Sequence, residues 1–144
     1  MEWKAESGRE IDESLKDEVL QKIEEGTLTM DDVRDFFTVF VQVAGNTEDI
    51  REEMEDFACN FQIEVNGEPA CWLSVCQGSF EAGSGPHPNP DVVLNMEEET
   101  ALGIFSGRVD PTAAYMCGDL EVEGIISDAI RLKDLLEMVQ DELD

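Results

Sequence analysis

Apolar residues recur at helical spacing in the first part of the chain. A stripe of them, four residues apart on an otherwise charged segment, predicts an amphipathic helix that ends at Gly26. The stripe consists of Ile11, Leu15, Val19 and Ile23. The ten residues before it are polar, and we expect them to be frayed.

A second helix is predicted over residues 33–44, with Thr29 and two acidic residues as its start signal. Its second half is apolar nearly all round, which indicates burial on more than one side. Gly45 is expected to end it, and a third helix is expected to run from Asn46 or Thr47 to about Phe57.

The apolar period then changes from helical to alternating. Residues 61–65 alternate between apolar and polar side chains, and Asn66-Gly67 follows as a strong turn signal. A second strand over 70–76 and a third over 79–82 are separated by Gln77-Gly78. Hairpin-length turns join antiparallel neighbours, so these three strands are predicted to form an antiparallel meander.

After a loop rich in glycine and proline at 83–90, the pattern predicts a fourth strand at 91–95 and a short helix that Gly107 ends. Asp110-Pro111 starts another helical turn, and a fifth strand is predicted at 120–123. A strand, helices and a strand in this order form a crossover unit. The fourth and fifth strands are therefore predicted to be parallel.

The last helix, predicted over 127–143, has an apolar face wider than one sheet face usually needs. Periodicity alone favours a well-packed core or a dimer seam. The alternative is that the additional apolar side chains line a cavity.

Composition limits the classes of function. The net charge is −26, from 35 acidic and 9 basic residues, and such a surface repels nucleic acid and anionic membranes. No apolar run is long enough to span a membrane, and the N-terminus lacks the pattern of a secretory signal. The four cysteines form no CxxC pair, so we expect reduced, mostly buried thiols in a cytoplasmic protein, with no metal and no cofactor.

No catalytic residue is predicted. His87 is the one histidine, it lies between two prolines in a loop where exposure is expected, and no nearby serine has the context of a nucleophile.

A series of motifs in the second part of the chain resembles the sterol carrier protein type 2 family, the sterol-transfer domain. The resemblance spans about Ile50 to Leu143, and the motifs occur in the family's order and spacing. They are Pro90 to Met96, Gly107-Arg108-Val109-Asp110-Pro111, Ala114-Tyr115-Met116, Gly118 to Gly124, Ala129-Ile130-Arg131-Leu132 and Leu135-Leu136.

The resemblance implies an α+β fold, with a five-stranded mixed sheet covered by helices on one face and an apolar tunnel between them. Residues 1–46 would be an N-terminal helical extension packed on the domain, and 47–144 the lipid-binding domain. The function implied is non-enzymatic carriage of fatty acyl, isoprenoid or sterol-like lipids. The alternatives are an accessory module for lipid or quinone metabolism with a vestigial cavity, and a hydrolase that uses His87. The residues expected to line the tunnel are Leu102, Phe105, Tyr115, Met116, Leu132, Leu135, Leu136 and Val139.

Two features depart from the family. Asp119, Glu121 and Glu123 stand where the family's strand often has lysines, so strong binding to anionic membranes is not expected. The additional helix at 33–44 could enlarge the core, which we favour, plug the tunnel mouth, or form a homodimer through the N-terminal helices.

Overall fold

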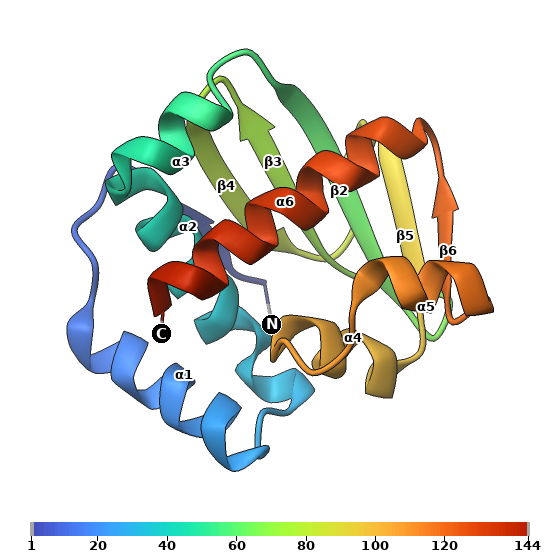
Figure 1. Cartoon of the computed structure of the whole chain (residues 1–144), viewed down its shortest axis with the longest axis horizontal. Helices are drawn as coiled ribbons and strands as arrows, with labels where there is room; N and C mark the ends of the chain where they lie inside the picture. The colour runs from blue at the N-terminus through green and yellow to red at the C-terminus, as the bar shows by residue number, and fades with distance from the viewer. Residues whose placement is uncertain (1, 144) are drawn as a thin grey trace.

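A computed structural model describes residues 2–143. Residue 1 of the predicted extension 1–46 and residue 144 of the predicted domain 47–144 lie outside this range. The described chain folds into a six-stranded sheet and a set of helices that cover one face of it (Figure 1). The helices are α1 (Glu13–Glu25), α2 (Val33–Asn46), α3 (Glu48–Glu53), α4 (Glu98–Phe105), α5 (Pro111–Cys117) and α6 (Ile126–Leu143). A 3-10 turn, η1 (Met30–Asp32), precedes α2.

The strands run in the order β1-β4-β3-β2-β5-β6. Their bounds are β1 (Lys4–Glu6), β2 (Ala58–Val65), β3 (Glu68–Cys76), β4 (Ser79–Ser84), β5 (Val92–Met96) and β6 (Leu120–Glu123). The predicted antiparallel meander is confirmed as β2, β3 and β4. Both predicted turns are present, since Asn66-Gly67 and Gln77-Gly78 have the positive φ angles that tight hairpins require.

The predicted parallel pairing of the last two strands is wrong, because β6 runs antiparallel to β5. The connection between them contains two helices, α4 and α5, separated at Gly107. After these two helices the chain re-enters the sheet at the same end at which β5 finished, so Leu120 at the start of β6 pairs with Met96 at the end of β5. The parallel pair is instead β2 with β5. The crossover is the 85–91 loop, which leads from β4 past β3 and β2 to β5.

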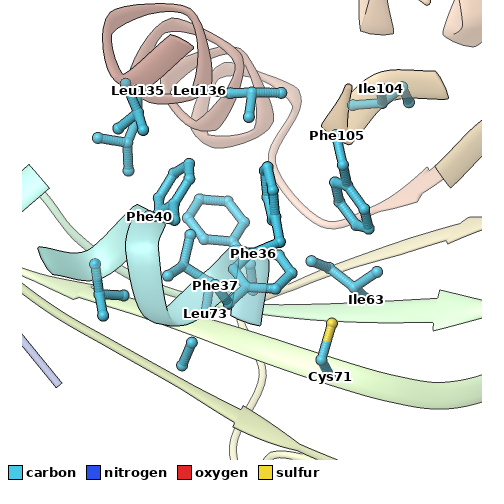
Figure 2. Close-up of a cluster of buried hydrophobic side chains, with 14 of the residues drawn as sticks. Phe36, Phe37, Phe40, Ile63, Cys71, Leu73, Ile104, Phe105, Leu135 and Leu136 are labelled. Carbon is cyan, nitrogen blue, oxygen red and sulfur yellow. The ribbon is translucent and has the colours of Figure 1, made fainter. Parts of the chain in front are cut away.

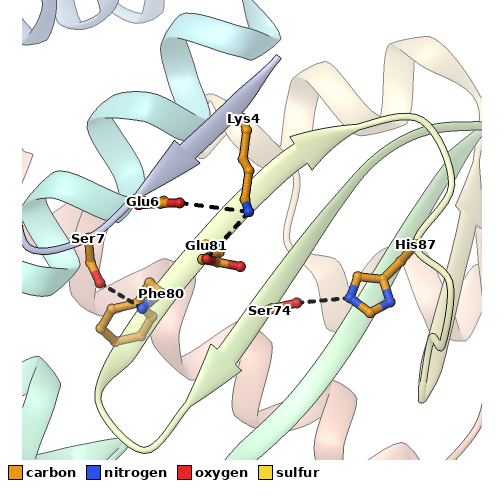
Figure 3. A network of polar contacts seen from close by, with 7 residues as sticks. All are labelled: Lys4, Glu6, Ser7, Ser74, Phe80, Glu81 and His87. Carbon is orange, nitrogen blue, oxygen red and sulfur yellow. Dashed lines mark hydrogen bonds and ion pairs between the residues drawn. The ribbon is translucent and has the colours of Figure 1, made fainter. Parts of the chain in front are cut away.

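The sheet has six strands rather than the five predicted, because β1 adds to the edge at β4. The expectation of a frayed N-terminus is therefore wrong. Ala5 is buried and pairs with Ala82, and the Ser7 N–H donates to the Phe80 carbonyl at 2.7 Å. The Phe80 N–H donates to Ser7 Oγ at 2.8 Å (Figure 3). Three residues of strand are too short for an alternating pattern to be recognised in sequence.

Gly45 does not end α2 as predicted, since the helix continues to Asn46. Its role is close packing, because a Cβ at this position would lie 2.6 Å from Ser7 Cβ. We expect Gly45→Ala to lower the free energy of unfolding by about 1–3 kcal/mol through overpacking, although alanine favours a helix. Urea denaturation measures this change. The double variant Gly45→Ala/Ser7→Gly is expected to cost less than the sum of the single changes, and strict additivity would contradict the contact.

The cysteines divide into two classes. Cys76 and Cys117 are exposed, contrary to the expectation of mostly buried thiols, whereas Cys59 and Cys71 are buried. Burial raises the pKa of Cys59 to about 12, with smaller contributions from Asp128 and Asp91, and burial alone raises the pKa of Cys71 to about 12.

We expect a thiol reagent to modify the native protein at Cys76 and Cys117 only. At about pH 8, a thiol with a pKa of about 12 is ionised in roughly one molecule in ten thousand, and the thiolate is the nucleophile. Peptide mapping after brief alkylation, with and without urea, measures the reaction site by site. Rapid native labelling of Cys59 or Cys71 would contradict the described burial.

Candidate functional site

An apolar cavity of about 340 Å³ lies between the helical face of the sheet and the helices that cover it. Its sheet side is formed by Ile63, Leu73, Leu94, Met96, Leu120 and Val122. Its helical side is formed by Phe36, Phe37, Phe40, Ile104, Phe105, Pro111, Thr112, Tyr115, Ile126, Ala129, Ile130, Leu132, Lys133 and Leu136. Four strands and four helices therefore contribute to one apolar wall.

One part of the cavity wall is a cluster of buried aromatic rings from α2 and α4. Phe105 stacks on Phe36 with ring centroids 5.1 Å apart and meets Phe37 edge-on at 5.3 Å. Phe40 adds a third contact to Phe36, at 6.1 Å. Figure 2 shows these rings between the sheet residues Ile63 and Leu73 and the α6 residues Leu135 and Leu136. Rings held on several sides give the cavity a rigid wall at this end.

The other part of the wall is open to solvent between α5 and α6. Tyr115, Ile126 and Ile130 line the cavity and yet are 44%, 41% and 51% exposed. We call this opening the mouth. An apolar cavity with a buried aromatic end and an exposed apolar mouth can admit an elongated apolar molecule from one side.

Polar groups at the wall are few. Among the described lining residues, Lys133 carries the one charge, and its Nζ lies 3.1 Å from Glu137 Oε1 one turn away on α6. The hydrogen bond to Glu137 raises the pKa of Lys133, so the ammonium group stays charged at neutral pH. In residues 2–143 no group of three or more His, Cys, Asp or Glu side chains is placed to hold a metal ion.

The eight residues predicted to line a tunnel fall into two groups. Phe105, Tyr115, Leu132 and Leu136 line the cavity. Leu135 and Val139 lie in the core at 0% and 1% exposure, Leu102 is half-buried beside the core, and Met116 is exposed. Ligand contacts of the first four residues remain predictions, whereas the other four do not line the cavity.

Sequence reasoning missed the contribution of α2 to the wall. Phe36, Phe37 and Phe40 form much of the aromatic end, whereas the helix was expected chiefly to enlarge the core. The sequence signal for this role was that α2 is apolar nearly all round, because a helix that is apolar on every side must contact more than the sheet.

His87 is half-buried, and the expectation that it is exposed is wrong. Its ring meets Trp72 edge-on at 5.0 Å, and its backbone N–H donates to Gln62 Oε1. Its ring Nε2 lies 3.3 Å from Ser74 Oγ (Figure 3). The Asn89 N–H donates to Nδ1, so the neutral ring carries its proton on Nε2. An Nε2 that carries a proton cannot accept the serine proton, and Nδ1 cannot donate to a carboxylate. Ser74 and His87 are therefore not arranged as the nucleophile and base of a hydrolytic triad.

Within residues 2–143 no helix has both the length and the apolarity needed to cross a membrane.

Comparison of the sequence and the fold with known proteins shows the family of this chain. Hydroxysteroid dehydrogenase-like protein 2 of Rattus norvegicus is 35% identical over 86 residues, which cover 58% of this chain and 16% of that protein. The human protein of the same name is 34% identical over 86 residues. This chain spans about a fifth of the length of these curated relatives.

Solved structures match the fold. The apo form of sterol carrier protein 2 from Yarrowia lipolytica has a TM-score of 0.58 at 18% identity, over 74% of this chain and 91% of that one. The crystal structure of a sterol carrier protein 2 has a TM-score of 0.57 at 16% identity, over 69% and 89% of the two chains. The model of the SCP-2 sterol transfer family matches residues 37–137, and the chain belongs to that family.

Proposed function

We propose that this protein holds an apolar lipid in the 340 Å³ cavity and carries it without chemical change. The observation that supports this most directly is the combination of an apolar wall with a mouth between α5 and α6. Phe36, Phe105 and Leu136 would contact the apolar part of the ligand. The position of Nε2–H in His87, away from the role of a general base, supports carriage rather than hydrolysis.

The cavity volume favours a single chain of moderate length. An engineered apolar cavity of about 150 Å³ holds benzene, so about 340 Å³ holds about 14 carbon atoms at the same packing. Each buried methylene contributes about 0.8 kcal/mol, and a ligand of this size gains on the order of 10 kcal/mol before ordering costs are subtracted. Before those costs, this gain exceeds the roughly 8 kcal/mol that corresponds to a Kd of 1 μM, so apolar burial can be the main source of affinity.

Extraction and direct binding test the proposal. The purified protein is extracted with organic solvent, the extract is analysed by mass spectrometry, and the delipidated protein is titrated with a fluorescent fatty acid. We expect a co-purified lipid or saturable binding of the probe, with displacement by lipids near 14 carbons. Absence of both would contradict the proposal.

A second function has one specific observation in its favour. The curated relatives are about five times longer than the matched segment, and their name is hydroxysteroid dehydrogenase-like protein. A domain of this kind can act as an interaction or accessory module of lipid or quinone metabolism, with a cavity that is vestigial. A stable complex with an enzyme of lipid metabolism, together with a protein that binds no lipid, would favour that function.

A further inference from the structure

Exposed large apolar side chains gather at one place on the molecule. In residues 2–143, the large hydrophobic side chains that stand exposed are Tyr115, Met116, Ile125, Ile126 and Ile130, at 44%, 81%, 63%, 41% and 51%. We call these five residues the mouth patch. They come from α5, the turn after β6 and the first turns of α6, which lie at the β6 edge of the sheet in Figure 1.

The mouth patch is continuous with the cavity. Tyr115, Ile126 and Ile130 belong to both, whereas Met116 and Ile125 are the most exposed of the five and do not line the cavity. Apolar surface therefore extends from the interior of the protein to its outside at these positions. A cluster of exposed hydrophobic side chains marks a surface that a membrane or another molecule covers.

The charges around the mouth patch limit what can cover it. Asp119, Glu121 and Glu123 are exposed and lie between the two segments of the patch in sequence, and Asp128 follows on α6. These carboxylates repel an anionic surface. They also disfavour a second copy of this chain, because a two-fold contact would place the same acidic groups of both copies against one another.

A neutral lipid surface fits both properties of the mouth patch. It offers an apolar interior for the five side chains, and its zwitterionic headgroups carry no net charge to oppose the carboxylates. A lipid that leaves the cavity into such a surface would not cross water.

We propose that the mouth patch docks on zwitterionic lipid membranes, with Met116 and Ile125 inserted at the level of the headgroups. The inference rests on the proposed function for its purpose. It is tested on its own, however, because docking is measured without a bound ligand.

The experiment is flotation of the full chain with vesicles of pure phosphatidylcholine and with vesicles in which phosphatidylserine replaces part of that lipid. We expect binding to phosphatidylcholine and weaker binding when phosphatidylserine is present at low salt. The variant Met116→Ser/Ile125→Ser is expected to lose at least about tenfold in partitioning, since each side chain loses a large part of its transfer free energy. The control Ala58→Ser/Cys76→Ser changes two exposed positions outside the patch and is expected to bind as the parent does.

Titration of each protein with a fluorescent fatty acid in solution separates this inference from the proposed function. Both variants are expected to bind the probe as the parent does. A parent protein that binds the probe but not phosphatidylcholine vesicles would overturn docking and leave carriage intact. Docking would also be overturned by equal vesicle binding of the two variants, by preference for phosphatidylserine, or by a parent dimer that the patch variant loses in sedimentation.

Discussion

Ala129→Trp is expected to remove lipid binding while leaving the fold in place. Ala129 lies on α6, lines the cavity and is only partly buried, so a larger side chain has room in the space that a ligand would occupy. Indole is larger than benzene, which fills about 150 Å³, and would take nearly half of the 340 Å³. Six methylenes displaced from the cavity correspond to about 5 kcal/mol. Titration with a fluorescent fatty acid should therefore show an affinity at least about 100-fold lower.

Ala113→Trp is the matched control for this change. Ala113 is exposed on α5 beside the mouth, and it does not line the cavity. Both variants place the same side chain in a helix, so the loss of helix propensity is common to them. We expect Ala113→Trp to bind the probe as the parent does, and both variants to melt within a few degrees of the parent without lipid. Wild-type affinity in Ala129→Trp would contradict the assignment of the cavity as the binding site.

The sequence determined the elements that carry local signals. Asn66-Gly67 and Gln77-Gly78 permit tight hairpins, so the antiparallel meander could be predicted without knowledge of the rest of the fold. Asp110 accepts a hydrogen bond from the Thr112 N–H, and Pro111 opens α5, as the Asp-Pro pair predicted. These features depend on residues close in the chain, where one backbone conformation is strongly preferred.

Features that depend on distant partners could not be predicted in the same way. The direction of β6 follows from where α4 and α5 return the chain, and β1 gains its partner in β4 some 75 residues later. The aromatic end of the cavity has the same origin, because Phe36 and Phe105 meet only in the folded protein. Four of the eight predicted lining residues point into the cavity, and the others on the same helices lie in the core or in solvent, because small rotations of a helix decide between these environments.

Phe36→Ala is expected to cause a large loss of stability and a shift in the preferred length of ligand. Phe36 is 2% exposed and contacts the rings of Phe37, Phe40 and Phe105. Removing a buried phenylalanine side chain costs about 3–5 kcal/mol. The space left behind adjoins the existing cavity, so a longer lipid can occupy it.

Phe61→Ala provides the comparison that separates these two effects. Phe61 is fully buried in β2 and pairs with Phe57 at 6.2 Å, but it does not line the cavity. Urea denaturation of the delipidated proteins should show a comparable loss for both variants. A ligand that binds only the folded state raises stability in proportion to the logarithm of its concentration over its Kd. Fatty acids of increasing length should therefore restore Phe36→Ala progressively, with an optimum longer than that of the parent, and should not shift the optimum of Phe61→Ala. An unchanged optimum in Phe36→Ala would show that the aromatic cluster does not set the length of the cavity.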